Sequence, residues 1–158
     1  MIEKLTIEHL VPYLSYGLKM RFQDTTGREI TLTGITYTGY GVAITGGHGS
    51  MWLNNCRFKP LLRPLSHLTK EITHGEDTFI MMDRLFEIEW PSKPKGNSPY
   101  YYNDAPNFIN IHHHNPAANT KILKNQMLNN PYWMIQELFK YHFDVFGLLA
   151  SGLALPIE

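Results

Sequence analysis

The sequence predicts an α+β fold, in which a small antiparallel sheet from the N-terminal third packs against C-terminal amphipathic helices. Apolar and polar residues alternate through 18–35, which is the period of strands with one buried face. From residue 131 onward, apolar residues recur at helical spacing. With 158 residues, 43% hydrophobic and 18% charged, the chain is expected to fold as a single domain over 1–158.

The N-terminal third is expected to hold a short helix and then the sheet. Thr6 is a good N-cap for a helix over 6–14, and Pro12 limits its length. Strands at 18–22 and 28–35 form a hairpin around a turn at 24–27, and two further strands at about 40–45 and 50–54 flank a glycine-rich turn. The sheet, whether flat or curved, therefore occupies 18–54. Its core-facing residues are expected to be Leu18, Met20, Phe22, Ile30 and Leu32.

The middle of the chain gives weaker patterns. Residues 66–72 are long enough for one or two helical turns after a proline-punctuated stretch. The apolar run at 77–90 fits either a short helix or a strand that leads into a helix. Residues 91–107 contain Pro91, Pro94, Pro99 and Pro106 among polar residues, so we expect a surface loop that ends regular structure.

The C-terminal third is expected to be helical. One helix is predicted over 119–130, and a second begins where Asn130 caps and Pro131 takes the first helical position. Gly147 and Gly152 are candidate helix ends, and the last residues form an extended segment. The second helix has one apolar stripe, which we expect to face the core: Ile135, Leu138, Phe139, His142, Phe143 and Phe146.

Charge and cysteine content limit the function classes. Lys plus Arg and Asp plus Glu both number 14, so no general field attracts nucleic acid, and little repulsion opposes self-association. The lone cysteine, Cys56, excludes an intramolecular disulfide. The N-terminus carries charges where a signal peptide needs an apolar run, and no stretch reaches the length of a membrane span. We expect a soluble cytoplasmic protein, with a protein partner or a second copy rather than nucleic acid or a membrane.

Three adjacent histidines, at 112–114, form the most conspicuous chemical pattern. On a strand over 108–114, His112 and His114 share one face. They would supply two ligands of a zinc or nickel site, which still needs another ligand from elsewhere. No second metal-ligand pattern accompanies them, so the alternative is a polar strand end with exposed histidines. We expect no cofactor, and zinc or nickel at His112 and His114 is the alternative.

The loop at 93–102 mixes cations with aromatic rings. Lys93 and Lys95 precede Tyr100, Tyr101 and Tyr102. Tyrosines of this kind commonly pack onto the sheet, and they also suit a protein contact. Stacking rings beside cations can bind single-stranded nucleic acid. We rank the packing role first, the protein contact second and the nucleic acid third.

Three other features have an ordinary structural explanation. His142 lies on the apolar stripe, so a core role is favoured over catalysis with Asp144 or Glu137. The glycine-rich stretch at 38–50 lacks the lysine of a phosphate loop and is interpreted as a hairpin turn. Cys56 has cations nearby, but a structural thiol is favoured over a nucleophile.

Three stretches together carry a family resemblance. They are "LTIEHLVPYLSYGLK" (5–19), "FKPLLRPLSHLTKEI" (58–72) and "WMIQELFKYHFDVFGLLASGLA" (133–154), of which "HFDVFGL" is the most specific. In this order they resemble a family of small uncharacterised proteins of Bacteroides-type gut bacteria, many of them encoded in prophage-like or other mobile regions. The resemblance implies a stand-alone cytoplasmic protein of mobile-element origin and transfers no catalytic residue.

We therefore expect a non-enzymatic accessory or protein-interaction protein of a mobile element. A metal-dependent enzyme that uses His112 and His114 is one alternative. A nucleic-acid-binding module that uses the loop at 93–102 is the other.

Overall fold

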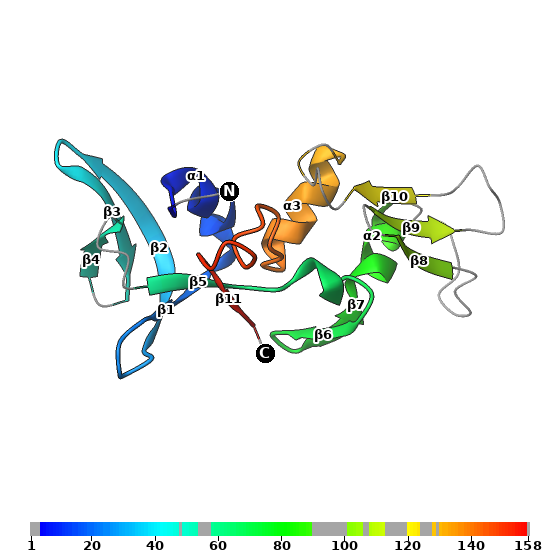
Figure 1. The fold of residues 1–158 in the computed structure, drawn as a ribbon, viewed down its shortest axis with the longest axis horizontal. Helices are drawn as coiled ribbons and strands as arrows, with labels where there is room; N and C mark the ends of the chain where they lie inside the picture. The colour runs from blue at the N-terminus through cyan, green and yellow to red at the C-terminus, as the bar shows by residue number, and fades with distance from the viewer. Residues whose placement is uncertain are drawn as a thin grey trace. The chain divides into compact units, whose positions relative to one another are not determined.

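A computed structural model of the chain describes residues 4–47, 49–53, 58–89, 101–105, 108–112, 120–123, 128 and 130–157. The chain forms two compact units. Unit 1 consists of Met1–Pro64 and Leu138–Glu158, and unit 2 consists of Leu65–Glu137. The expectation of a single domain stays a prediction. Strands and helices occur in both units, and the chain has the predicted α+β class (Figure 1).

Unit 1 is built on a six-stranded sheet with the order β11-β5-β1-β2-β3-β4. Its strands are β1 (Lys19–Phe22), β2 (Glu29–Thr38), β3 (Gly41–Gly46), β4 (Gly49–Trp52), β5 (Phe58–Leu62) and β11 (Leu155–Pro156). Neighbours are antiparallel except for β11 and β5, which are parallel. Both predicted hairpins are confirmed. The sequence did not predict β5, because Pro60 indicates a break in regular structure. In the fold, Pro60 lies within a buried apolar run and belongs to the strand.

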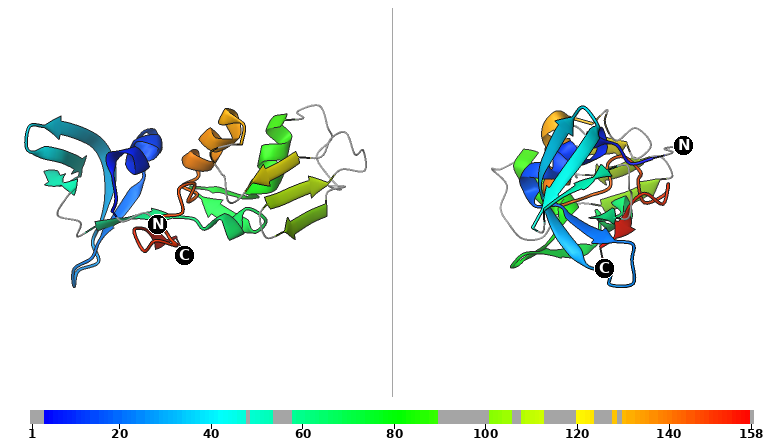
Figure 2. Two further views of the ribbon diagram at one scale, coloured as in Figure 1. Left: turned by 45° about the horizontal axis from the view of Figure 1, so that its top comes forward. Right: turned by 90° about the vertical axis from the view of Figure 1, so that its left-hand side faces the viewer.

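The helical opening of unit 1 is confirmed. Helix α1 (Ile7–Leu10) starts after Thr6, and a 3₁₀ helix, η1 (Val11–Tyr16), continues it with Pro12 in its first turn. Gly17 ends η1 in the left-handed region, with φ 67°, and turns the chain into β1. Figure 2 shows this helical segment against the strands of unit 1.

The sheet side of the predicted core is largely confirmed. Leu18, Met20, Ile30 and Leu32 are buried, whereas Phe22 is only half-buried and makes an edge-to-face contact with Phe58. A bulge between Leu32 and Gly34 shifts the register of β2 against β3. Beyond this bulge, the inward positions of β2 move by one residue.

The C-terminal helix is shorter than predicted. Helix α3 (Tyr132–Lys140) begins in unit 2 and ends in unit 1, six positions before Phe146, the last residue of the predicted apolar stripe. His142 adopts a left-handed conformation with φ 60°. Its N–H bonds to the carbonyl of Phe139, and the N–H of Phe143 bonds to the carbonyl of Leu138. This pair of bonds is the Schellman pattern that closes a helix.

The apolar stripe nevertheless continues into the core beyond the helix. Phe143 is buried and Phe146 is half-buried, and both belong to the turns that follow α3. Helical periodicity therefore extended the prediction too far. Gly147 and Gly152 have φ values of 74° and 68° and lie in the irregular segment between α3 and β11 rather than at ends of helices. The extended C-terminal segment is confirmed by β11.

Unit 2 combines short strands with helices. A 3₁₀ helix, η3 (Leu65–His67), precedes the hairpin of β6 (Glu71–His74) and β7 (Asp77–Ile80), which leads into α2 (Met81–Glu89). The strand-then-helix alternative for 77–90 is thus confirmed, and the helical turns predicted for 66–72 are limited to η3. A three-stranded antiparallel sheet has the order β10-β9-β8, with β8 (Tyr101–Ala105), β9 (Phe108–His112) and β10 (Thr120–Leu123).

Two predictions for unit 2 are wrong in part. Residues 120–123 form a strand rather than part of a helix over 119–130, and residues 101–105 form a strand within the predicted loop at 91–107. In both places the partner is β9, whose Ile109 and Ile111 have high strand propensity. Pairing with a distant strand thus decides the conformation of these segments. Residues 91–100 lie outside the described residues.

Candidate interaction surface

The predicted metal site is only partly within the described residues. His112 is the last residue of β9, where its backbone pairs with Tyr101 of β8. His113 and His114 lie outside the described residues. Within the described part of the chain, no group of three His, Cys, Asp or Glu side chains is placed to hold a metal ion. The zinc or nickel site at His112 and His114 stays a prediction.

The predicted lysine and tyrosine loop is divided in the same way. Tyr101 and Tyr102 belong to β8 and pair with His112 and Ile111 of β9. Lys93, Lys95 and Tyr100 lie outside the described residues, as does Cys56. Two of the five proposed contact residues therefore stand on a strand rather than in a loop, and their binding role stays a prediction.

Four buried polar residues of unit 1 hold three of its segments together. We call Tyr13, Arg63, His142 and Asp144 the polar node. All four are less than 9% exposed. They come from η1, from the residue that follows β5, and from the turns after α3. The polar node therefore connects three segments that are far apart in the sequence.

Tyr13 is the centre of the polar node. Its hydroxyl donates a hydrogen bond of 2.7 Å to the carbonyl of Phe143 and accepts one of 3.4 Å from the N–H of Val145. Its ring packs edge-to-face on Phe139, with centroids 4.8 Å apart. Burial raises the pKa of Tyr13 well above its usual range. The phenol is thus held neutral and serves as a structural donor.

Asp144 organises the turn that follows it. Its carboxylate accepts hydrogen bonds from the N–H groups of Leu148 at 2.8 Å and Leu149 at 2.9 Å. Burial raises the pKa of Asp144, and these N–H groups, together with the charge of His9, oppose that rise. The carboxylate is therefore engaged in holding backbone amides rather than facing an open site.

His142 and Arg63 join the end of α3 to the sheet. His142 Nε2 lies 2.8 Å from the carbonyl oxygen of Tyr16, which is the core role predicted for this residue. The Arg63 N–H donates to the carbonyl of His142 at 2.7 Å, and the Arg63 carbonyl accepts from the N–H of Asp144 at 2.9 Å. These bonds extend the edge of β5 onto the segment at 142–144. The polar node thus explains how the "HFDVFGL" segment is held.

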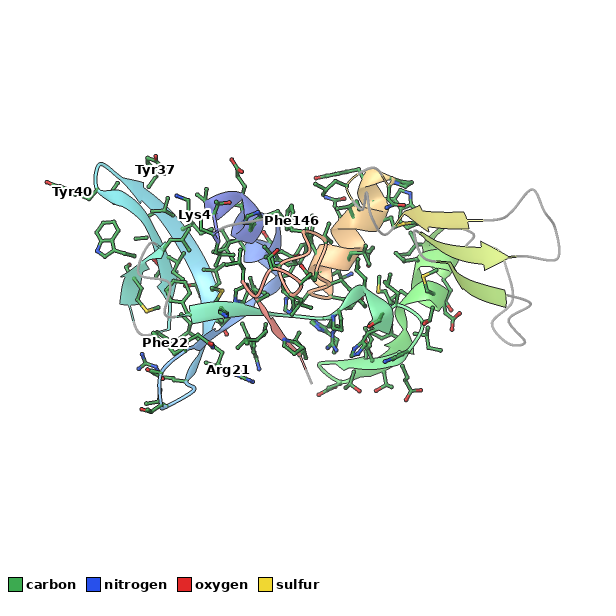
Figure 3. All side chains as sticks on the ribbon, viewed as in Figure 1. Lys4, Arg21, Phe22, Tyr37, Tyr40 and Phe146 are labelled. Carbon is green, nitrogen blue, oxygen red and sulfur yellow. The ribbon has the colours of Figure 1, made fainter. Side chains whose placement is uncertain are left out.

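The opposite end of the sheet has a different character. Tyr40, in the turn between β2 and β3, is 92% exposed, Tyr37 of β2 is 78% exposed and Trp52 of β4 is 40% exposed. We call these three residues, with the strands that carry them, the hairpin surface. Figure 3 shows Tyr37 and Tyr40 near the β2–β3 turn, with both side chains pointing outward.

The register of the strands places the aromatic rings around the end of the sheet. Tyr37 pairs with Val42, and Trp52 pairs with Ala43, the next residue of β3. Because successive residues of a strand point to opposite faces, Tyr37 and Trp52 lie on opposite faces. The other exposed large apolar residues of the described chain lie on different elements: Val11, Ile88, Leu128 and Tyr132. The hairpin surface thus presents exposed aromatic rings on both faces of one end of the sheet.

Local hydrogen bonds hold the backbone of the hairpin. The Thr38 hydroxyl donates to the carbonyl of Gly41 and accepts from the N–H of Tyr40 at 3.2 Å. On the next pair of strands, the hydroxyls of Thr45 and Ser50 lie 3.1 Å apart. These bonds fix the backbone that carries the aromatic rings, which lowers the ordering cost of a contact.

Sequence reasoning assigned no role to the hairpin surface. Tyr37, Tyr40 and Trp52 all fell within the predicted sheet region, where aromatic residues are common as packing material. The usable signal was the sequence "TYTGYG", in which aromatic residues stand beside the glycines of a predicted turn. Turns lie at the surface, so a tyrosine in such a turn is expected to be exposed.

Comparisons with known proteins identify no relative: no protein-family model, curated protein or solved structure matches the chain. Among the helices of the described residues, none has the length and apolar character that crossing a bilayer requires.

Proposed function

We propose that this chain is a protein-interaction protein, and that it acts as a non-enzymatic accessory protein of a mobile element. The observation that carries the proposal is the hairpin surface, with Tyr40 92% exposed on a turn whose backbone is hydrogen-bonded to Thr38. Tyrosine and tryptophan are enriched at protein interfaces because each offers a large area with few rotatable bonds. The mobile-element origin rests on the sequence resemblance alone.

The use made of the buried ionisable groups also supports the proposal. Tyr13 and Asp144 direct their polar atoms to backbone groups of unit 1. Such groups stabilise the fold and are not presented to a substrate. The hairpin surface, in contrast, presents three aromatic side chains to the outside.

Site-specific photo-crosslinking tests the proposal. A benzophenone amino acid replaces Tyr40 in one variant and Trp52 in another, and Thr25, which is exposed in the β1–β2 turn, is replaced as the matched control. The variants are irradiated in a gut bacterium of the Bacteroides type. We expect positions 40 and 52 to capture the same protein, which position 25 does not capture. Excess wild-type chain should compete for the capture, and the Tyr40→Ala chain should not.

Two results would overturn the proposal. Capture at position 25 equal to that at 40 and 52 would mean that the hairpin surface has no special role. Crosslinks to nucleic acid alone would favour a nucleic-acid-binding module instead, and their loss at high salt would identify phosphate contacts as the cause.

A further inference from the structure

The outer edge of β4 is an unpaired strand edge within the described part of the chain. One side of β4 pairs with β3 over residues 49–52, and β4 ends the strand order of the six-stranded sheet. The backbone N–H and C=O groups on such an edge are a template for another strand. The partner that fits this edge is therefore an extended segment of another chain.

The β4 edge lacks the side chains that commonly block edge pairing. Its residues are Gly49, Ser50, Met51 and Trp52, none of which is charged or proline. The other edge of the same sheet, β11, has only two residues, and one of them is Pro156. Proline cannot donate a ladder hydrogen bond, so that edge is closed to further strands. The two edges of one sheet thus differ in whether they can accept a partner.

We propose that β4 pairs in antiparallel orientation with β4 of a second copy of this chain. The inference rests on the proposed function and names its partner. Charge favours a second copy as the occupant: β4 carries no charge, and the whole chain has a formal net charge of zero, so no net repulsion opposes self-association. A charged partner strand would find no opposite charge on β4, so this edge would not select it.

A two-fold axis fixes the register of such a pair. In an antiparallel pair, facing side chains point to the same side of the sheet, so a two-fold axis must pass midway between one residue and the same residue of the second copy. With the axis at Met51, each Trp52 lies opposite Ser50 of the second copy. Ser50 is small and exposed and shares its face with Trp52, so the indole ring gains a partner without a clash. Since β4 has only four residues, this side-chain contact must supplement the backbone bonds.

Sedimentation velocity of the purified full chain tests the inference. We expect a concentration-dependent dimer in the wild type. The substitution Ser50→Glu places a charge in the interface and should weaken the dimer by about tenfold or more. Thr31→Glu is the matched control, because Thr31 is exposed on the central strand β2, opposite Lys19. That variant should dimerise like the wild type.

A disulfide probe gives a readout that does not depend on the stability of a charged variant. In a Cys56→Ser background, Met51→Cys places two thiols across the axis, at roughly the 4.5–5.5 Å Cα spacing of paired strands that a disulfide can span. Oxidation should yield a covalent dimer, whereas Thr25→Cys in the same background should not.

A monomeric wild type would overturn the inference, as would a dimer that Ser50→Glu leaves intact and Met51→Cys does not crosslink. The proposed function fails separately, through the crosslinking experiment at positions 40 and 52. A monomeric chain that still captures a different protein there would contradict the second-copy partner and support the interaction role.

Discussion

The polar node and the hairpin surface belong to the same unit and use the same types of residue in opposite ways. Tyr13 is fully buried, and its hydroxyl bonds to the backbone of the "HFDVFGL" segment. Tyr40 is 92% exposed, and only its backbone is held, by Thr38. Stability is therefore expected to depend on the first region and binding on the second. Variants that separate these two effects test the comparison.

Asp144→Ala should have the largest effect on stability. It leaves the buried N–H of Leu148 and that of Leu149 without their acceptor, so the free energy of unfolding should fall by about 2–4 kcal/mol. Asp24→Ala is the matched control, since Asp24 caps exposed N–H groups in the β1–β2 turn. Denaturant titration measures both variants. An equal loss in the two would contradict a structural role for the polar node.

Tyr13→Phe should have the next largest effect. It removes the donor to Phe143 and the acceptor for Val145 while it keeps the ring packed on Phe139, so we expect a loss of about 1–3 kcal/mol. Tyr40→Phe should change stability by less than about 0.5 kcal/mol, because the hydroxyl is exposed. The same titration compares the pair. Similar losses for Tyr13 and Tyr40 would remove the distinction between the two regions.

His142 offers a test of the end of α3. Both His142→Ala and His142→Gly lose the bond to Tyr16, but glycine adopts the left-handed conformation without strain. The glycine variant should therefore be more stable than the alanine variant by about 1 kcal/mol. If thermal unfolding shows His142→Ala to be more stable than His142→Gly, strain in the left-handed backbone does not determine which residues this position tolerates.

His9 should make the smallest contribution, one that depends on pH. Its Nδ1 accepts the N–H of Thr6 at 3.1 Å, so the ring must be neutral at that nitrogen. Burial lowers the pKa of His9 from its usual value of 6.5, while Glu8 and Asp144 oppose the shift. Because the pKa of His9 is lower in the folded state, the contribution of His9 to stability is fully present above pH 6.5. That contribution is lost as the pH falls through the pKa of the folded state.

His9→Gln provides the matched control for that pH dependence. A glutamine oxygen can accept the same N–H as part of a capping box and does not titrate. Between pH 7 and pH 5, the wild type should lose about 0.5 kcal/mol relative to His9→Gln, a value reduced by the partial exposure of the ring. If the wild type and His9→Gln lost the same stability between pH 7 and pH 5, protonation of His9 would not control the N-cap of α1.

Sequence reasoning predicted the elements that local patterns determine. Alternation located β1 and β2, and Thr6 with Pro12 located α1 and η1. It failed where pairing with a distant strand decides the conformation of a segment. β10 is a strand because it pairs with β9, and β5 is a strand between β1 and β11 although it contains Pro60. Sequence reasoning also carried α3 too far, since Phe143 keeps its inward position after the helix has ended at Lys140.

The candidate sites were less predictable than the fold. The sequence drew attention to His112 and to the tyrosines near 100, because adjacent identical residues are conspicuous. The hairpin surface depends on how exposed Tyr37, Tyr40 and Trp52 become, which the strand order and register determine. The polar node depends on contacts between residues more than 120 positions apart, which no local pattern contains.

Hydrogen exchange at two protein concentrations compares the two regions in one experiment. If the hairpin surface mediates self-association and the polar node holds the fold, amides at 49–52 should exchange more slowly at the higher concentration. Amides at 143–149 should be slow at both concentrations. Exchange at 49–52 that is unchanged by concentration, or rapid exchange at 143–149, would contradict this division of roles.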